Sequence, residues 1–308
     1  ADSENLNLTK ANLVAFSSRI IAAARAIESR RPDRLFNDWF AELLPGASLN
    51  VEAIATSTEP GSNCPKQSAD GTDVSAPERD SASRRFALRT RFGDDFFEDC
   101  TLPPKSIKQI VSLGAGMDTR GLRLRASAGT TVFEIDQALV LTVKRSILAG
   151  ASLRTVSVGE TLSGVGKAWV IGVEADLGQA EWEGELLQAG FDPALPSAWI
   201  LEGLTMYLEE QEIEKLLQIV AKLCSSGSAF CATCISAECL KRSKKIDDDI
   251  LRTWKWGSDD PQASFQCFFP AGWSFKYVPY ATPGEFPDGA GYSLGYKGRK
   301  AYVIGYVR

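Results

Sequence analysis

Histidine is absent from the 308 residues of this sequence. The absence excludes Ser-His-Asp and Cys-His hydrolases in their usual forms, metal sites with histidine ligands, and histidine general bases. Long apolar runs are also missing, since the longest, such as residues 107–113, are far too short to cross a bilayer. Any catalysis must therefore use carboxylates, tyrosine, lysine, arginine, cysteine or a cofactor, and no membrane association is expected.

Positive charge is scarcer than negative charge: 34 Lys and Arg stand against 39 Asp and Glu, for a net charge of −5. Nucleic-acid binders usually carry a basic surface, because contacts with phosphates supply most of their affinity. The sequence therefore predicts no nucleic-acid partner. Its first residues show no secretory signal, although a sequence that starts at Ala1 is also compatible with a removed leader. We expect a cytoplasmic protein.

The seven cysteines are an odd number without the spacing of a disulfide framework, which favours a reducing compartment. Cys231 and Cys234 form a Cys-x-x-Cys pair, but they lie within an apolar segment typical of a buried strand. Side chains three positions apart on a strand point to opposite faces, a poor geometry for one metal ion or one disulfide. We therefore interpret both as buried core residues and predict no metal site.

The chain has two regions with different patterns, 1–105 and 106–308. In the first region, apolar periodicity predicts helices at 13–29, 34–44 and 84–97. A polar segment at 56–83 predicts a surface loop, which is either a lid or an insertion. We interpret the first region as a helical region packed on a core formed by the second, within a single domain overall.

Strands and helices alternate from residue 106 onward. The predicted strands are at 107–113, 130–136, 168–174, 198–201 and 229–235, with predicted helices at 138–148, 182–189 and 209–223. This alternation is typical of a parallel sheet covered by helices on both faces. After a further predicted helix at 237–256, strands at 274–280 and 300–307 predict a hairpin-like pair that closes one edge of the sheet.

A pair of glycines, Gly114 and Gly116, lies between the first predicted strand and a helical stretch. At such a turn glycine lets a ligand approach the backbone closely, and the helix N-terminus offers unpaired N–H groups. A tight strand-to-helix turn would favour glycine as well. No Gly-Lys-Ser/Thr follows, which excludes a P-loop, and the third glycine of a dinucleotide-binding fingerprint is missing.

Two aspartates near this turn indicate what the ligand is. Asp118 would disfavour a dinucleotide pyrophosphate but would suit a cationic group. It therefore favours S-adenosylmethionine (SAM), whose amino and sulfonium groups are positive, over NAD. Asp136 ends the second strand about 20 residues after Gly116, a distance typical of the carboxylate that binds ribose hydroxyls. The alternative for Asp136 is to cap the helix that follows.

Acidic residues also follow two later strands. Asp176 comes after the third strand, where it can accept from an adenine amino group while Leu177 packs on the ring; a helix cap is the alternative. Glu202 follows the fourth strand, where an unpartnered carboxylate would be costly to bury, so a function is plausible. Tyr207, shortly after it, could face a substrate.

Several short segments occur in a characteristic order. They are Arg25-Ala-Ile-Glu-Ser29, Arg31-Pro-Asp-Arg-Leu-Phe-Asn-Asp38, Leu88-Arg-Thr-Arg-Phe92, Leu113-Gly-Ala-Gly-Met-Asp-Thr-Arg120, Phe133-Glu-Ile-Asp-Gln137, Ala175-Asp-Leu177, Ala189-Gly-Phe-Asp-Pro193 and Glu202-Gly-Leu-Thr-Met-Tyr-Leu208. Together they resemble the leucine carboxyl methyltransferase superfamily, especially its bacterial-type branch of SAM-dependent methyltransferases. The resemblance covers residues from about 20 to 208. It implies a Rossmann-like, class I methyltransferase α/β fold, with a seven-stranded, mainly parallel sheet and an N-terminal helical lid.

The resemblance also implies the cofactor and its contacts. SAM would be contacted by Gly114, Ala115, Gly116, Asp136, Asp176, Leu177 and Glu202. Arg89 would bind the SAM carboxylate, as a guanidinium can do in a bidentate pair, and Arg25 would act similarly. The chain departs from the branch at Trp39 and Ala138, where the branch has proline. Because of these departures, the resemblance does not predict the identity of the substrate.

The expected activity is O-methylation of a carboxylate or hydroxyl on a small molecule, since methyl transfer needs mainly proximity and orientation. A carboxylate acceptor needs no base, in agreement with the missing histidine; a hydroxyl acceptor would need one, Glu202 or Tyr207. One alternative is an NAD(P)-dependent oxidoreductase, against which the missing third glycine argues. Another is a non-catalytic SAM-binding protein, against which Asp136, Asp176 and Glu202 argue. No protein-acceptor surface is indicated.

Overall fold

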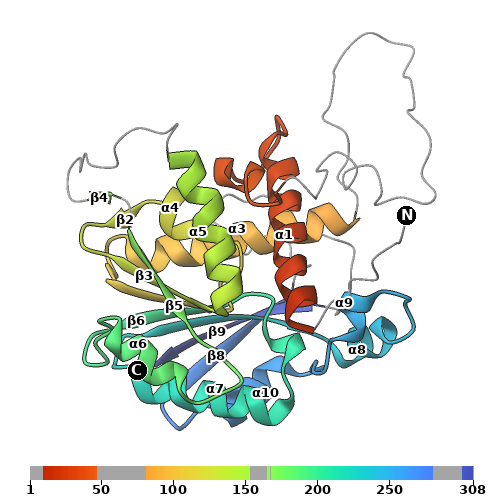
Figure 1. Ribbon diagram of the computed structural model, residues 1–308. Coiled ribbons are helices and arrows are strands. Elements are labelled where there is room, and N and C mark those ends of the chain that lie inside the picture. Colours follow the sequence, from red (N-terminus) through yellow and green to blue (C-terminus); the bar gives the residue numbers. More distant parts are fainter. Residues whose placement is uncertain (1–9, 47–80, 153–164, 167, 280–299, 308) are drawn as a thin grey trace, which may run out of the picture.

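The computed structural model describes residues 10–46, 81–152, 165–166, 168–279 and 300–307 (Figure 1). Most of the predicted polar loop at 56–83 lies outside the described residues. Within them, no helix combines the length and the apolar character that crossing a membrane requires.

One seven-stranded sheet forms the centre of the molecule, in the order β5-β3-β1-β6-β7-β9-β8. Its strands are β1 (Gln109–Leu113), β3 (Thr131–Asp136), β5 (Trp169–Glu174), β6 (Ser197–Leu201), β7 (Ala229–Ile235), β8 (Trp273–Pro279) and β9 (Lys300–Val307). The first five in sheet order are parallel, whereas β9 is antiparallel to both β7 and β8. The predicted α/β fold and the antiparallel pair at one edge are confirmed.

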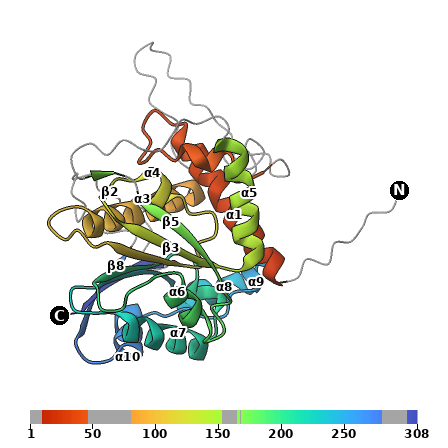
Figure 2. The ribbon, with the colours of Figure 1, turned by 60° about the vertical axis from the view of Figure 1, so that its left-hand side comes forward.

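Helices cover both faces of this sheet (Figures 1 and 2). On one face are α3 (Ser81–Thr101), α4 (Arg120–Arg123) and α5 (Ala138–Ser152), and on the other are α6 (Trp182–Gln188), α7 (Glu210–Leu223) and α10 (Pro261–Phe268). Alternate residues of β1 face the two sides: Ile110 packs in one cluster with Phe97 of α3, and Val111 in another with Leu216 of α7. A strand covered on both faces is apolar throughout, which explains why the strands could be predicted.

The N-terminal helix α1 (Lys10–Ser29) packs beside α3 and the 3-10 helix η1 (Trp39–Glu42). It also contacts α9 (Asp249–Arg252), far along the chain. The predicted helix at 34–44 is wrong, because only η1 is helical there. Before η1, the backbone N–H groups of Leu35 and Asp38 donate to the side chains of Glu28 and Ser29 instead of forming helical bonds.

The predicted helix at 237–256 is also wrong. The structure has α8 (Ala237–Ser243) and then the separate α9. Asp248 accepts from the backbone N–H of Leu251 at 2.9 Å and so starts a new helix at that point. A short two-stranded sheet of β2 (Ala126–Ser127) and β4 (Val165–Gly166) was not predicted.

Candidate functional site

The sheet order reverses between β1 and β6, since the chain builds β3 and β5 on one side of β1 and β6 and β7 on the other. A crevice at the carboxyl ends of the strands is expected at such a point. A cavity of about 870 Å³ lies there, lined by the residues that follow β1, β3, β5 and β6 and by parts of α1, α3, α8 and α9. The residues that the sequence singles out all line it: Arg25, Arg89, Gly114, Ala115, Gly116, Asp118, Asp136, Asp176, Leu177, Glu202 and Tyr207.

The glycine turn after β1 needs glycine for two structural reasons. Gly114 and Gly116 have φ angles of +66° and +50°, which side chains rarely tolerate. A Cβ on Gly114 would lie 3.0 Å from Leu204 Cδ1, and one on Gly116 would lie 2.9 Å from Ser18 Cβ. The turn is therefore a bare backbone surface enclosed by α1 and the loop after β6.

Asp136 lies at the end of β3 and holds this turn in place. Its carboxylate accepts from the backbone N–H of Gly116 and of Gln137, each at 2.7 Å, rather than from the first turn of α5. Burial raises the pKa of the Asp136 carboxyl, although these two N–H groups oppose the shift. These two hydrogen bonds do not support the alternative that Asp136 caps the first turn of α5. Its carboxylate lines the cavity instead.

Asp176 and Leu177 follow β5 on the same edge of the sheet. Asp176 accepts from the backbone N–H of Gly178 at 3.0 Å, a local turn that presents the carboxylate at the cavity wall. The Leu177 side chain is buried beside it and packs with the core. An acceptor and an apolar surface therefore lie next to each other where the sequence predicts an adenine site.

Glu202, after β6, is held by two arginines. Its Oε1 accepts from Arg89 Nε at 2.8 Å and its Oε2 from Arg120 Nη2 at 2.6 Å, and all three side chains are at most 15% exposed. Two guanidinium groups therefore hold the Glu202 carboxylate, one at each oxygen. Tyr207, in η2 (Thr205–Tyr207), donates its hydroxyl to Ser17 of α1 at 3.4 Å.

Asp118 and Arg25 have partners inside the protein. Asp118 accepts from the backbone N–H of Thr119 and Arg120 and pairs with the Arg120 guanidinium at 3.1 Å. Burial would raise the pKa of Asp118, but Arg120 and Lys144 hold it well below its usual value. Arg25 donates to Asp38 at 2.8 Å and to the Met117 carbonyl.

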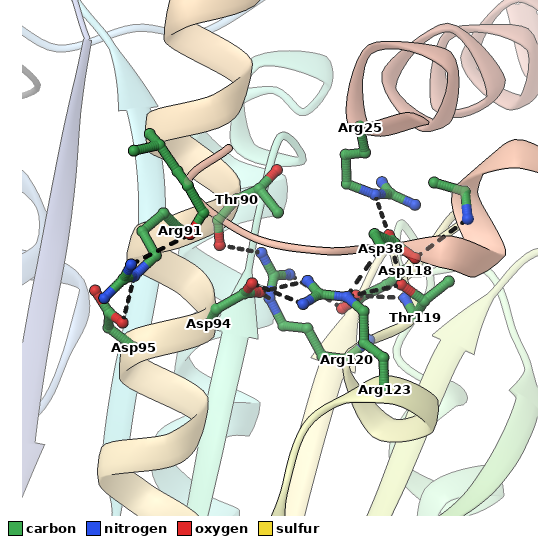
Figure 3. A network of polar contacts seen from close by, with 12 residues as sticks. Arg25, Asp38, Thr90, Arg91, Asp94, Asp95, Asp118, Thr119, Arg120 and Arg123 are labelled. Atoms are coloured by element: carbon green, nitrogen blue, oxygen red, sulfur yellow. Dashed lines mark hydrogen bonds and ion pairs between the residues drawn. The ribbon is translucent and has the colours of Figure 1, made fainter. Parts of the chain in front are cut away.

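A chain of buried ion pairs underlies this cavity (Figure 3). Arg120 and Arg123 both pair with Asp94 of α3, at 2.9 and 2.6 Å, and Arg123 lies 3.6 Å from Asp38. Asp38 in turn pairs with Arg25 and accepts from Thr119 Oγ1 at 2.7 Å. The pairs thus connect α1 and the 34–44 segment to Arg120 and Glu202, and sequence reasoning missed this role of Asp38, Asp94, Arg120 and Arg123.

Gly93, within α3, carries a signal that could have revealed the network. A glycine inside a helix lowers the helix stability by about 1 kcal/mol relative to alanine, so a glycine there indicates a structural requirement. A Cβ there would clash with the Arg120 guanidinium, 2.7 Å from Cζ, and would lie 2.9 Å from Glu202 Oε2. Gly93 therefore leaves the space in which Arg120 reaches Glu202.

The ion pairs of Asp38 predict a pH-dependent stability. Burial alone would raise the pKa of Asp38, but Arg25 and Arg123 hold it below the usual value of 3.8. A carboxyl with a lowered folded-state pKa stabilises the fold above the unfolded-state pKa, and this contribution disappears as the pH falls through the folded-state value. We expect Asp38→Asn to lower the free energy of unfolding by a constant amount between pH 5 and 8, and by less below about pH 3.8.

Urea unfolding of wild type and Asp38→Asn from pH 8 to pH 3 measures this difference. Asp33→Asn is the control, because Asp33 is an exposed carboxylate in the same segment. The ionisation argument fails if the deficit of Asp38→Asn begins to shrink already at neutral pH.

Cys231 and Cys234 are both buried in β7, as predicted. Burial raises the pKa of the Cys234 thiol to about 12, so the thiol form is the stable one. Across the described parts of the chain, no group of three or more His, Cys, Asp or Glu side chains could hold a metal ion.

Comparison with known proteins identifies relatives over most of the chain. The family model described as "Leucine carboxyl methyltransferase" matches residues 18–221. A protein of Mycolicibacterium gilvum (strain PYR-GCK) is 35% identical over 254 residues, covering 81% of this chain and 74% of its own. Another, from Mycobacterium sp. (strain JLS), is 33% identical over 97% of this chain and 88% of its own. Both carry the name of S-adenosyl-L-methionine-dependent methyltransferases.

Among solved structures, a DUF574 family protein from Streptomyces avermitilis matches with a TM-score of 0.50 and 11% identity, over 74% of this chain and 86% of its own. A likeness at this identity concerns the fold only. It agrees with the α/β architecture described above.

Proposed function

Because this chain belongs to the leucine carboxyl methyltransferase family and is a SAM-dependent methyltransferase of the class I fold, we propose that it methylates an oxygen atom of a small molecule, with a carboxylate preferred to a hydroxyl. Homologues at this level of identity support SAM as the cofactor.

The residues of the cavity fit the parts of SAM. Asp136 would bind the ribose hydroxyls, and Asp176 and Leu177 the adenine. Arg89 and Glu202, a cation and an anion side by side, suit the carboxylate and the amino group at the other end of the molecule. The bare backbone of Gly114, Ala115 and Gly116 would lie between these two groups of residues. Arg25 would be a further contact of the SAM carboxylate.

One observation supports a carboxylate acceptor. Each carboxylate found among the described lining residues already accepts a hydrogen bond from an arginine, a lysine or a backbone N–H; they are Asp118, Asp136, Asp176, Glu202, Glu212 and Asp248. Each of the six carboxylates is therefore already engaged by a donor of the protein. A hydroxyl acceptor must lose a proton, whereas a carboxylic acid is already ionised at neutral pH. Tyr207 remains the base candidate if the acceptor is a hydroxyl.

The reaction then needs no proton transfer. Bound SAM would supply a methyl group on a positive sulfur, and its transfer to the acceptor oxygen would leave the electron pair of the carbon–sulfur bond on sulfur. With a carboxylate, a negative and a positive reactant become a neutral ester and a neutral thioether. The protein's task is to hold the two reactants in line and to exclude water.

Calorimetric titration with S-adenosylhomocysteine, with NAD and NADP as parallel ligands, tests the cofactor site. We expect micromolar binding of S-adenosylhomocysteine alone. Binding of NAD or NADP instead would favour the oxidoreductase alternative.

A screen with methyl-labelled SAM over carboxylic acids and phenols then tests the chemistry. Labelled product that releases methanol in mild alkali is an ester, whereas an alkali-stable product is an ether. An alkali-stable product would overturn the preference for carboxylates. Binding of S-adenosylhomocysteine without transfer to any acceptor of either class would favour a non-catalytic SAM-binding protein.

A further inference from the structure

The cavity that holds the predicted SAM contacts is also lined by residues of α1, η2, α8, α9 and the segment that ends at Trp254. The apolar side chains in this part of the lining are those of Ile20, Ile21, Met206, Ile246, Ile250, Leu251 and Trp254. We call this part the acceptor compartment. Figure 1 shows α8 and α9 at the end of α1, on the opposite side of α1 from α5.

The acceptor compartment is built as one unit. Met206 and Trp254 belong to one apolar cluster, against which Tyr207, Cys239 and Leu251 pack. The hydroxyl of Tyr207 bonds to Ser17 of α1, and α1 also contacts α9, so α1 connects two parts of the lining. An apolar lining with a few polar groups is typical of small-molecule pockets.

The two parts of the cavity differ in their relation to the family. The predicted SAM contacts lie within the family match at residues 18–221, whereas α8, α9 and Trp254 lie after its end. Four of the seven apolar side chains of the acceptor compartment therefore lie outside the family match, and the other three, Ile20, Ile21 and Met206, lie within it. We expect the residues outside the match to contribute most to the choice of acceptor.

One large apolar side chain of the acceptor compartment, that of Ile246, is exposed to solvent. Ile246 lines the cavity and is 50% exposed, between α8 and α9. Exposed apolar surface inside a cavity is stabilised when an apolar ligand covers it. Two charged side chains also line this part of the cavity: Arg242 pairs with Glu238, and Asp248 accepts from the Leu251 backbone N–H.

We propose that the acceptor compartment binds a small carboxylic acid with an apolar body, whose hydrocarbon part lies against Ile246, Ile250 and Leu251. The inference rests on the proposed function, which places a carboxylate oxygen at the SAM site. The total cavity volume of about 870 Å³ lies within the ~300–1,000 Å³ typical of small-molecule sites, which favours a small acid. The body can be aliphatic or aromatic, since both present apolar surface.

The test is calorimetric titration of the protein saturated with S-adenosylhomocysteine. The probes are octanoate for an aliphatic body, 3-phenylpropanoate for an aromatic one, and succinate as a polar acid with a second carboxylate in place of the apolar body. We expect octanoate or 3-phenylpropanoate to bind at least tenfold more tightly than succinate. Equal or tighter binding of succinate, or no binding of either apolar acid, overturns the proposal.

Two matched variants assign the site. Ile246→Asp places a charge in the compartment, whereas Leu195→Asp places it at an equally open position, 48% exposed, outside the cavity. We expect Ile246→Asp to weaken binding of the apolar acid at least tenfold and to leave S-adenosylhomocysteine affinity within twofold; Leu195→Asp should change neither. Equal effects of the two variants overturn the assignment.

Failure of this inference and failure of the proposed function are distinguishable. If S-adenosylhomocysteine binds and labelled methyl is transferred only to polar acids, the compartment assignment is wrong and the function stands. If S-adenosylhomocysteine does not bind, the cofactor site is wrong, while binding of octanoate that Ile246→Asp weakens would still support the compartment.

Discussion

Arg120→Met is expected to lower the free energy of unfolding by about 3–5 kcal/mol, the usual cost of removing one partner from a buried ion pair. Arg120 is 4% exposed and its guanidinium contacts three carboxylates, those of Asp94, Asp118 and Glu202. Methionine fills a similar volume but leaves these carboxylates without their shared cation. Their mutual repulsion in a buried environment is the physical cause of the loss.

Urea unfolding followed by circular dichroism measures the change, with Arg145→Met as the matched control. Arg145 pairs with Glu174, but both side chains are about half exposed. Exposed pairs contribute about 0–1 kcal/mol, so the control should be nearly as stable as wild type. Similar losses for Arg120→Met and Arg145→Met would show that the buried network contributes no more than a surface pair.

Asp136→Asn is expected to weaken S-adenosylhomocysteine binding by about 10- to 150-fold, which corresponds to the ~1.5–3 kcal/mol of a hydrogen bond to a charged group. The proposed role of Asp136 is to accept from the ribose hydroxyls, and the amide accepts more weakly and carries no charge. Asparagine keeps one carbonyl oxygen, which can still accept from the Gly116 backbone N–H. The amide nitrogen then faces the Gln137 backbone N–H, so the variant loses that hydrogen bond and keeps the one to the glycine turn.

Glu174→Gln is the control for this variant, because Glu174 is the register partner of Asp136 on the adjacent strand β5 but does not line the cavity. Calorimetric titration of both variants gives the comparison, and their thermal melts show whether either has lost structure. Unchanged affinity for S-adenosylhomocysteine in Asp136→Asn would mean that the ribose assignment is wrong.

Most of the fold could be predicted because its patterns are local. Buried parallel strands are apolar throughout, as β1 and β7 are, and the helices between them keep one apolar face. The two wrong helices arose where side chains compete with helical hydrogen bonds. Asp38 and Asp248 each accept from a backbone N–H three residues later and start a new helix, which periodicity alone does not show.

The sequence by itself determined the α/β class, the strand ends that carry Gly114, Asp136, Asp176 and Glu202, and the absence of histidine chemistry. These features depend on residues close together in the chain. Only the tertiary structure decided what surrounds Glu202, because Arg89 and Arg120 reach it from 113 and 82 residues away. It likewise decided that α1 contacts α9 and that both helices line the same cavity. Contacts over such separations form when elements pack, and no local pattern of residues encodes them.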